Sequence, residues 1–296
     1  MNRKISALIL LLLFSLTAYP QTIHLWKGTS VKASGVTLVP FLPESASDVP
    51  AVIVCPGGSY FWLDRTNEGT MVCEWLRSNG IAAFLLEYRT GGWFEYTFAT
   101  RAVFRGHQHP DMIEDIQRAV QTVRENHELY GVDPSKIGCM GFSAGGHLVM
   151  SSAEYFGTDF LKPHGIDSSV SLRPDFVAPI YPVVSMSADC THHRSRRGLL
   201  GERRVRSLEM RDSLSLEKHV RQDTPPVFLL NCVDDPVVDF HNSELLDSAL
   251  AAAGVPHQYI QFQTGGHGFG ANPDRFTEET AGWQELFMQW IRRLFQ

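Results

Sequence analysis

The sequence predicts an α/β fold, in which a mostly parallel central sheet carries helices on both faces. Short apolar runs of strand length alternate along the chain with segments of helical period. The runs are almost continuously hydrophobic, as expected of strands that are buried on two sides. A composition with 44% hydrophobic and 20% charged residues over 296 positions is typical of a globular protein.

Five apolar runs are predicted to form the parallel strands, and a sixth is predicted to be an antiparallel edge. The five are residues 51–55, 81–86, 136–140, 176–180 and 227–230. Residues 36–41 precede them and alternate more clearly between polar and apolar side chains, which suits an edge. Apolar residues at helical spacing over 112–123, 245–253 and 283–294 predict two crossover helices and a final helix that closes the fold.

We expect residues 1–20 to be a signal peptide and residues 21–296 to form one domain. Arg3 and Lys4 give a positive start, an apolar run follows, and small residues end it. A membrane anchor is the alternative, but the apolar run is shorter than the ~20 residues that a bilayer crossing needs. The mature protein is therefore expected to be secreted or periplasmic in a bacterium, without a stable membrane span. Its five cysteines, an odd number, are expected to be mostly free and buried.

Two stretches interrupt the alternation of strands and helices. Residues 90–109 are rich in glycine and aromatic residues, and residues 185–224 are polar and arginine-rich. Insertions of this kind usually lie over an active site, so we expect residues 185–224 to form a short lid. The arginines of residues 192–211 suit a solvated surface. The alternative is contact with uronic acids, because guanidinium pairs well with carboxylate.

The formal net charge of −6 gives no field that would attract nucleic acid or an anionic membrane. A small neutral or sugar-like substrate fits this charge better. The sequence carries no signal for an oligomeric state.

The segment GFSAGG at 141–146 follows a predicted strand and precedes a helical run. A G-x-S-x-G motif in this context is typical of a nucleophile elbow, a tight strand-to-helix turn that exposes the serine oxygen. We therefore expect Ser143 to be the nucleophile. The motif alone is weak, because it appears by chance in roughly one chain in ten of this length, as an ordinary glycine-rich turn.

The segment PGGSY at 56–60 directly follows the strand predicted over residues 51–55. This is where the same fold places a loop whose amides stabilise an oxyanion. We expect the oxyanion hole to be formed by the amides of Gly58, Ser59 and Ala144, with a simple glycine turn as the alternative for the loop.

Two later segments supply an acid and a base. NCVDDPVV at 231–238 places carboxylates after a strand, and TGGHGFG at 264–270 frames a histidine with glycines before the final helix. We expect His267 to be the general base and Asp235 to orient it. A lone histidine is more often structural, but the chain order Ser, Asp, His matches the α/β-hydrolase fold and differs from trypsin-like and subtilisin-like proteases.

Together these motifs resemble α/β-hydrolase superfamily esterases, in the group of acetylxylan esterases and of dienelactone-hydrolase-like and feruloyl-esterase-like carbohydrate esterases. The matching segments are GFSAGGH at 141–147, PGGSY at 56–60, YR at 88–89, YP at 181–182, TPP at 224–226 and GGHGF at 265–269. The resemblance spans nearly all of the mature chain. It implies an α/β-hydrolase fold and a serine esterase that removes acetyl, or sometimes feruloyl, groups from plant polysaccharides.

The family spacing selects Asp235 over Asp234, because the catalytic Asp stands three residues before a Val. The sequence departs from the family at Ser59, where many relatives have a third glycine, and at Asp239, where many have proline. The first departure is mild, since an oxyanion donor is a backbone amide that serine also has.

The expected chemistry is acyl transfer in two steps through an acyl-enzyme. No metal or organic cofactor is expected, because the sequence has no H-E-x-x-H pattern and the pair His192 and His193 lies in a polar stretch without ligand partners. His147 is expected to pack or hydrogen-bond beneath the elbow rather than to act in catalysis.

Tyr60, Trp62 and Trp93 are candidates for the substrate pocket, since aromatic faces suit pyranose rings. The equal alternative is that they anchor loops. Two other classes of function stay open. A serine exopeptidase shares the fold and the triad order but usually adds a large propeller domain, and a non-catalytic carbohydrate-binding scaffold usually loses a triad residue.

Overall fold

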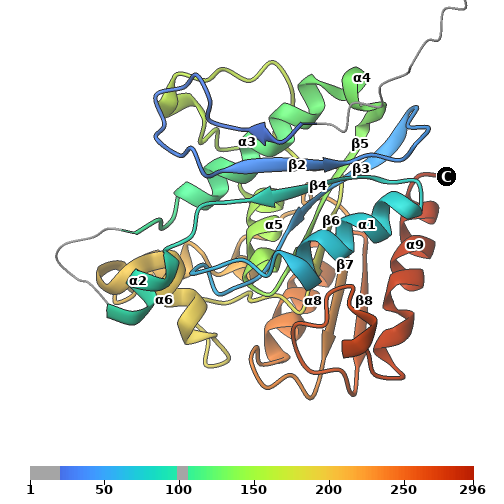
Figure 1. The fold of residues 1–296 in the computed structure, drawn as a ribbon. Coiled ribbons are helices and arrows are strands. Elements are labelled where there is room, and N and C mark those ends of the chain that lie inside the picture. The colour runs from blue at the N-terminus through green and yellow to red at the C-terminus, as the bar shows by residue number, and fades with distance from the viewer. Residues whose placement is uncertain (1–20, 99–105) are drawn as a thin grey trace, which may run out of the picture.

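The computed structural model describes residues 21–98 and 106–296, so the predicted signal peptide lies outside the described residues. Within them, an eight-stranded sheet has the order β1-β2-β4-β3-β5-β6-β7-β8 (Figure 1). Its strands are β1 (Ile23–His24), β2 (Thr37–Phe41), β3 (Val49–Cys55), β4 (Ala82–Glu87), β5 (Val132–Phe142), β6 (Val177–Ile180), β7 (Val227–Cys232) and β8 (His257–Phe262). β2 pairs antiparallel with β1 and β4, and the other neighbours are parallel.

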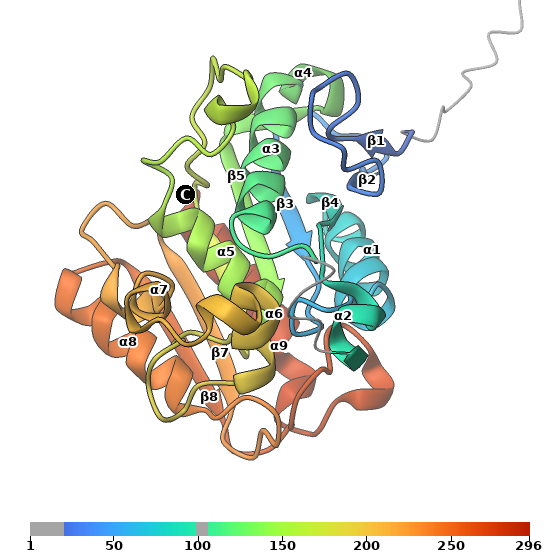
Figure 2. The same cartoon turned by 90° about the vertical axis from the view of Figure 1, so that its left-hand side faces the viewer.

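Helices cover both faces of this sheet, and Figure 2 shows α5 in front of it and α9 behind. The helices are α1 (Met71–Ser78), α2 (Gly92–Phe98), α3 (Asp111–Glu125), α4 (His127–Tyr130), α5 (Ala144–Glu154), α6 (His193–Arg204), α7 (Leu208–Asp212), α8 (His241–Ala253) and α9 (Trp283–Leu294). One core joins the sheet to α3, α5 and α8, and a second core joins it to α1 and α9. The predicted α/β-hydrolase fold class is confirmed.

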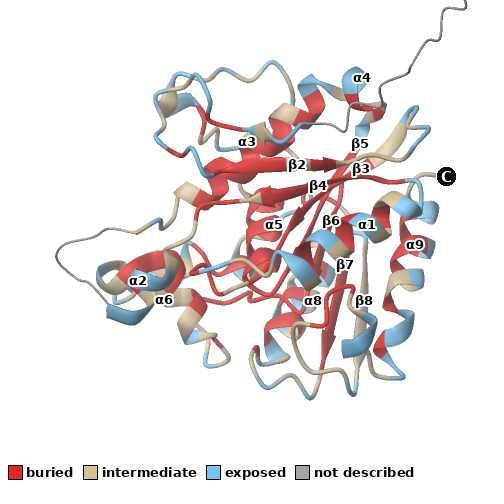
Figure 3. Cartoon of the chain, in the orientation of Figure 1, coloured by how far each residue is buried: buried red, intermediate tan, exposed pale blue. Residues whose placement is uncertain are grey.

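Successive side chains of the central strands point to opposite faces of the sheet, so they pack alternately into the two cores. In β3, Ile53 belongs to the first core, and Val52 and Val54 belong to the second. Because both faces are covered, both sets of side chains are apolar, which produces the continuous hydrophobic runs of the sequence. Figure 3 shows this burial along the strands and on the helix faces that meet them.

The predicted strands and helices all form, with small differences at their ends. β2 is antiparallel as predicted, but it is not outermost, because β1 pairs with it. The hydrophobic pattern does not predict β8. This strand lies at the sheet edge with all six residues half-buried, so polar side chains interrupt its apolar ones.

Both insertions contain helices. Residues 90–109 include α2, and residues 185–224 include α6 and α7 (Figure 2). All five cysteines lie in the described part of the chain and carry free thiols, four of them buried, as expected. No helix among the described residues is long and apolar enough to cross a membrane.

A buried ion pair holds the segment that follows β4. The Arg89 guanidinium lies 2.8 Å from Asp115 Oδ1, and its side chain is only 8% exposed. Trp26 Nε1 donates to the same carboxylate oxygen at 2.7 Å. Next to Arg89, Tyr88 Oη donates to Pro56 O at 2.6 Å, so this part of the fold supports the loop that follows β3.

We expect Asp115→Ala to lower the free energy of unfolding by about 3–5 kcal/mol, because it leaves the buried Arg89 without its central partner. Urea denaturation followed by circular dichroism measures the change. The control is Glu74→Ala, which removes an exposed pair with Arg77 and should cost less than about 0.5 kcal/mol. If both variants lowered the free energy of unfolding equally, the buried pair would stabilise the fold no more than the exposed pair does.

Candidate active site

Ser143 lies at the sharp turn between β5 and α5. Its φ of 54° and ψ of −118° are values that residues with side chains rarely adopt. Neighbouring backbone holds this strained residue: Ser143 N donates to Ile180 O at 3.0 Å, and Ser143 O accepts from Val183 N at 3.2 Å. This is the geometry expected of a nucleophile elbow.

The elbow packs directly against the end of β3, and glycines make this approach possible. A Cβ at Gly145 would overlap Cys55 O. A Cβ at Gly57 would lie 2.9 Å from Ser143 Cβ and 2.7 Å from Glu68 Oε2. Any side chain at these two positions would push residues 56–60 away from the serine.

Asp235 fixes the imidazole of His267. His267 Nδ1 lies 2.6 Å from Asp235 Oδ2, and the two side chains are 12% and 1% exposed. The other carboxylate oxygen accepts from Val237 N at 2.8 Å and from Val238 N at 2.9 Å. A proton on Nδ1 satisfies the carboxylate and leaves the other ring nitrogen, Nε2, as an acceptor.

The neighbouring carboxylate of Asp234 has different partners. It accepts from Gly266 N at 2.8 Å and from Gly265 N at 3.3 Å, so it holds the loop that carries His267. Of the two candidate acids, the structure joins Asp235 to the imidazole and Asp234 to the backbone.

Of the predicted oxyanion residues, Ala144 directly follows Ser143, and Gly58 and Ser59 lie in the loop whose Gly57 approaches it. Gly58 and Ser59 have φ values of 137° and 57°, and their amides donate to no acceptor within the described residues. Ala144 is the first residue of α5, where amides lack an intrahelical partner.

The aromatic candidates have different environments. Tyr60 is fully buried, and its Oη lies 2.7 Å from His147 Nδ1, so it anchors its loop. Trp62 is 37% exposed and Trp93 is 70% exposed. Both rings contact Tyr96, with centroids 5.1 and 5.4 Å away, and both keep an accessible surface.

His147 has the structural role expected of it. Nε2 donates to Leu214 O at 2.9 Å, and Nδ1 accepts from the Tyr60 hydroxyl. The ring therefore joins the elbow helix to residues 185–224 and to the loop after β3. Burial lowers the pKa of His147 to about 4, so the ring is neutral at neutral pH.

Glu68 is a buried acid that the sequence analysis does not identify. Its carboxylate accepts from Gly57 N at 2.7 Å and from Tyr181 Oη at 2.9 Å. Tyr181 Oη accepts from Gly270 N at 3.0 Å, and the Tyr181 ring centroid lies 4.6 Å from that of His267. Burial raises the pKa of the Glu68 carboxyl, and the nearby imidazole of His267 opposes that rise.

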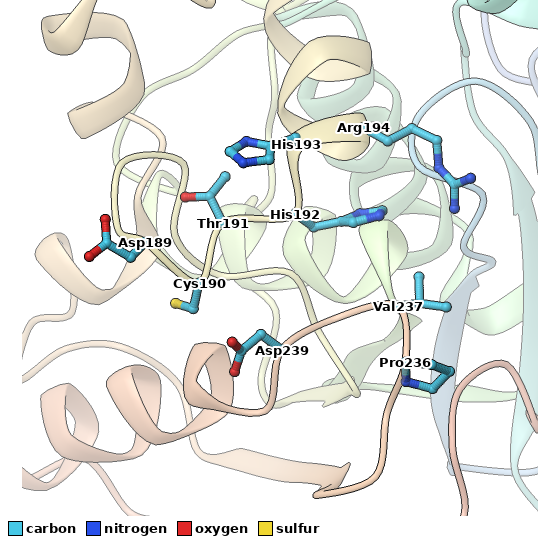
Figure 4. Close-up of a pocket in the computed structure, with 9 residues that line it drawn as sticks. All are labelled: Asp189, Cys190, Thr191, His192, His193, Arg194, Pro236, Val237 and Asp239. Carbon is cyan, nitrogen blue, oxygen red and sulfur yellow. The ribbon is translucent and has the colours of Figure 1, made fainter.

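A pocket of about 650 Å³ opens beside the Asp235 turn (Figure 4). Its lining residues come from the turn itself and from the start of α6: Asp189, Cys190, Thr191, His192, His193, Arg194, Pro236, Val237 and Asp239. Burial, followed by the charge of Arg194, lowers the pKa of His192 to about 4. In the described part of the chain, no cluster of three or more His, Cys, Asp or Glu residues could hold a metal ion.

Comparison with known proteins gives one family and several relatives. The BD-FAE family matches residues 40–250. An acetylxylan esterase of Xylanibacter ruminicola is 30% identical over 91% of this chain and 51% of its own length. An endo-1,4-beta-xylanase B of Butyrivibrio fibrisolvens is 34% identical over 82% of this chain and 36% of its own length.

One solved structure matches this chain over nearly the full length of both proteins. The acetyl ester-xyloside bifunctional hydrolase of Caldicellulosiruptor lactoaceticus superimposes with a TM-score of 0.81 at 32% identity, over 95% of this chain and 98% of that one. The two curated relatives are longer, and this chain spans only a third to a half of their length.

The buried His147 predicts a loss of stability in acid. Its pKa is about 4 in the folded protein and near 6.5 in the unfolded chain, so the unfolded chain takes up the proton first as the pH falls. The free energy of unfolding therefore decreases between pH 6.5 and pH 4, with up to about 3 kcal/mol from this residue. Urea denaturation at a series of pH values measures the slope.

We expect His147→Gln to flatten part of that slope and His24→Gln, at an exposed position, to keep it. The same slope in wild type and His147→Gln would contradict the assignment.

Proposed function

The chain belongs to the BD-FAE family, and on this premise we propose that it is a serine carboxylic-ester hydrolase that removes acetyl groups from plant polysaccharides or their oligosaccharides. The observation that carries the proposal is the 2.6 Å bond between Asp235 and His267, in a fold where a strained serine lies in the turn between β5 and α5. Family membership supports the ester as the bond that is broken.

In the proposed mechanism, His267 accepts the Ser143 proton as the serine oxygen attacks the ester carbonyl. The imidazolium then donates the proton to the departing sugar hydroxyl, and the acetyl group stays on the serine. His267 then deprotonates a water that attacks the acyl-enzyme, and the proton passes from His267 to the Ser143 oxygen as the acetate leaves. Asp235 stabilises the imidazolium in both steps.

The negative oxygen of each tetrahedral intermediate would lie against the amides of Ala144 and of Gly58 or Ser59. One such donor is typically worth ~3 kcal/mol of barrier. The positive φ at Gly58 and Ser59 supports this role, because it turns successive amides of residues 56–60 in an unusual direction.

Three further features belong to the proposal. The acetylxylan esterase and the acetyl ester-xyloside hydrolase among the relatives favour an acetylated xylan-type substrate, with feruloyl or other small esters as the alternative. Residues 21–296 would act as one domain. A signal peptide at residues 1–20 would export the protein.

The reaction class can be tested with one substrate panel. We expect fast release from acetylated xylo-oligosaccharides and 4-nitrophenyl acetate, slower release from butyryl and feruloyl esters, and none from an aminoacyl anilide. Ser143→Ala should lower kcat by at least about 10³-fold, because the nucleophile is lost. Ser169→Ala, an exposed serine, should match wild type. Fast anilide cleavage, or an active Ser143→Ala protein, would contradict the proposal.

Mutation distinguishes the roles of the neighbouring residues Asp234 and Asp235. Asp235→Asn should lower kcat by about 10²–10⁴-fold, because the amide no longer stabilises the imidazolium. Asp234→Asn keeps an oxygen that can accept from the Gly265 and Gly266 amides, so we expect a loss below about tenfold. Initial rates on 4-nitrophenyl acetate measure both, with thermal unfolding as a check of folding. The opposite ranking would overturn the role of Asp235.

A further inference from the structure

We propose that the pocket beside the Asp235 turn is an anionic-sugar site, in which Arg194 binds the carboxylate of a uronic acid close to the acyl ester that is cleaved. This inference rests on the proposed esterase function and specifies its substrate.

Two contacts fix the position of Arg194. Its Nε donates to Ser59 Oγ at 3.0 Å, and its guanidinium carbon lies 5.6 Å from the centroid of the Trp62 ring. Ser59 belongs to the proposed oxyanion loop, so the guanidinium lies beside the position of the reacting ester. Among the described residues, no carboxylate pairs with Arg194.

The other arginines at the start of α6 are bound to the protein itself. Arg196 donates to Met186 O at 3.1 Å. Arg197 pairs with Glu202 at 2.6 Å and donates to the carbonyl oxygens of Glu95 and Tyr96. The sequence favours a solvated surface for these arginines and leaves contact with uronic acids as the alternative; the contacts above direct that alternative to Arg194.

The pocket has opposite charges at its two ends. Figure 4 shows the side chains of His192 and Arg194 extending to the same side, above Pro236 and Val237, with Asp189 at the other end. A carboxylate would be attracted to Arg194 and repelled by Asp189 and Asp239. These acidic groups suit sugar hydroxyls, which donate hydrogen bonds to carboxylate oxygens.

His192 and the size of the pocket also suit a uronic acid. His192 is neutral above about pH 4, so it offers a polar ring without adding positive charge. The volume of about 650 Å³ lies within the ~300–1,000 Å³ typical of small-ligand sites. Arginine binds carboxylates through two parallel N–H donors, which lysine cannot do. Arg194 therefore gives the site both charge and orientation.

The test compares two substrates that differ in one group. Mono-O-acetylated methyl glucuronopyranoside carries a carboxylate where mono-O-acetylated methyl glucopyranoside carries a hydroxymethyl group. We expect wild type to have a kcat/KM at least about tenfold higher on the uronide, the range of a charge-assisted hydrogen bond. In Arg194→Gln the ratio between the two substrates should fall to near one. Arg194→Lys should keep an intermediate ratio, because the charge stays and the paired donors are lost.

The control is Arg203→Gln, which removes an exposed charge from the same helix and should keep the wild-type ratio. An equal kcat/KM of wild type on both substrates, or an Arg194→Gln protein with the wild-type ratio, would overturn the anionic-sugar site. Hydrolysis of 4-nitrophenyl acetate is measured in parallel. If it is absent in wild type, the esterase function itself has failed, whereas activity there with no preference between the sugars refutes only the role of Arg194.

Discussion

The arrangement of the site depends on one buried carboxylate. Glu68 bonds to Gly57 in the loop after β3 and to Tyr181 after β6, and Tyr181 bonds in turn to Gly270 after β8. These segments are far apart in the sequence and begin at different strands. Since each would otherwise be free to shift alone, the shared carboxyl group fixes the proposed oxyanion loop relative to the loop that carries His267.

This carboxylate also affects the charge around His267. Asp235 contacts the ring directly, and Glu68 lies behind it with Tyr181 between them. The imidazolium that forms in the proposed mechanism would therefore have the Asp235 carboxylate bonded to it and the Glu68 carboxyl group in its surroundings. A buried acid is costly to desolvate, and here hydrogen bonds from an amide and a phenol stabilise its charged form.

The sequence predicts the parts of the fold that follow from local patterns. Two-sided burial produces apolar runs for the parallel strands, and the elbow and the histidine loop have glycines at fixed positions. Glu68, Arg194 and β8 have no such pattern. Glu68 and Arg194 resemble surface residues until the fold brings partners to them, and β8 is too exposed to be continuously apolar. For Tyr60, composition leaves a pocket residue and a loop anchor equally open, and its hydroxyl bonds to His147 inside the protein.

Residues 185–224 are attached to the site at several points. Leu214 O is bonded to His147, Arg194 is bonded to Ser59, and Gly198 approaches Ser59 so closely that a Cβ there would overlap its carbonyl oxygen. A swinging flap would break all of these contacts at once. The insertion is therefore better described as a fixed part of the rim, which hydrogen bonds and close backbone packing hold against the elbow helix and the loop after β3.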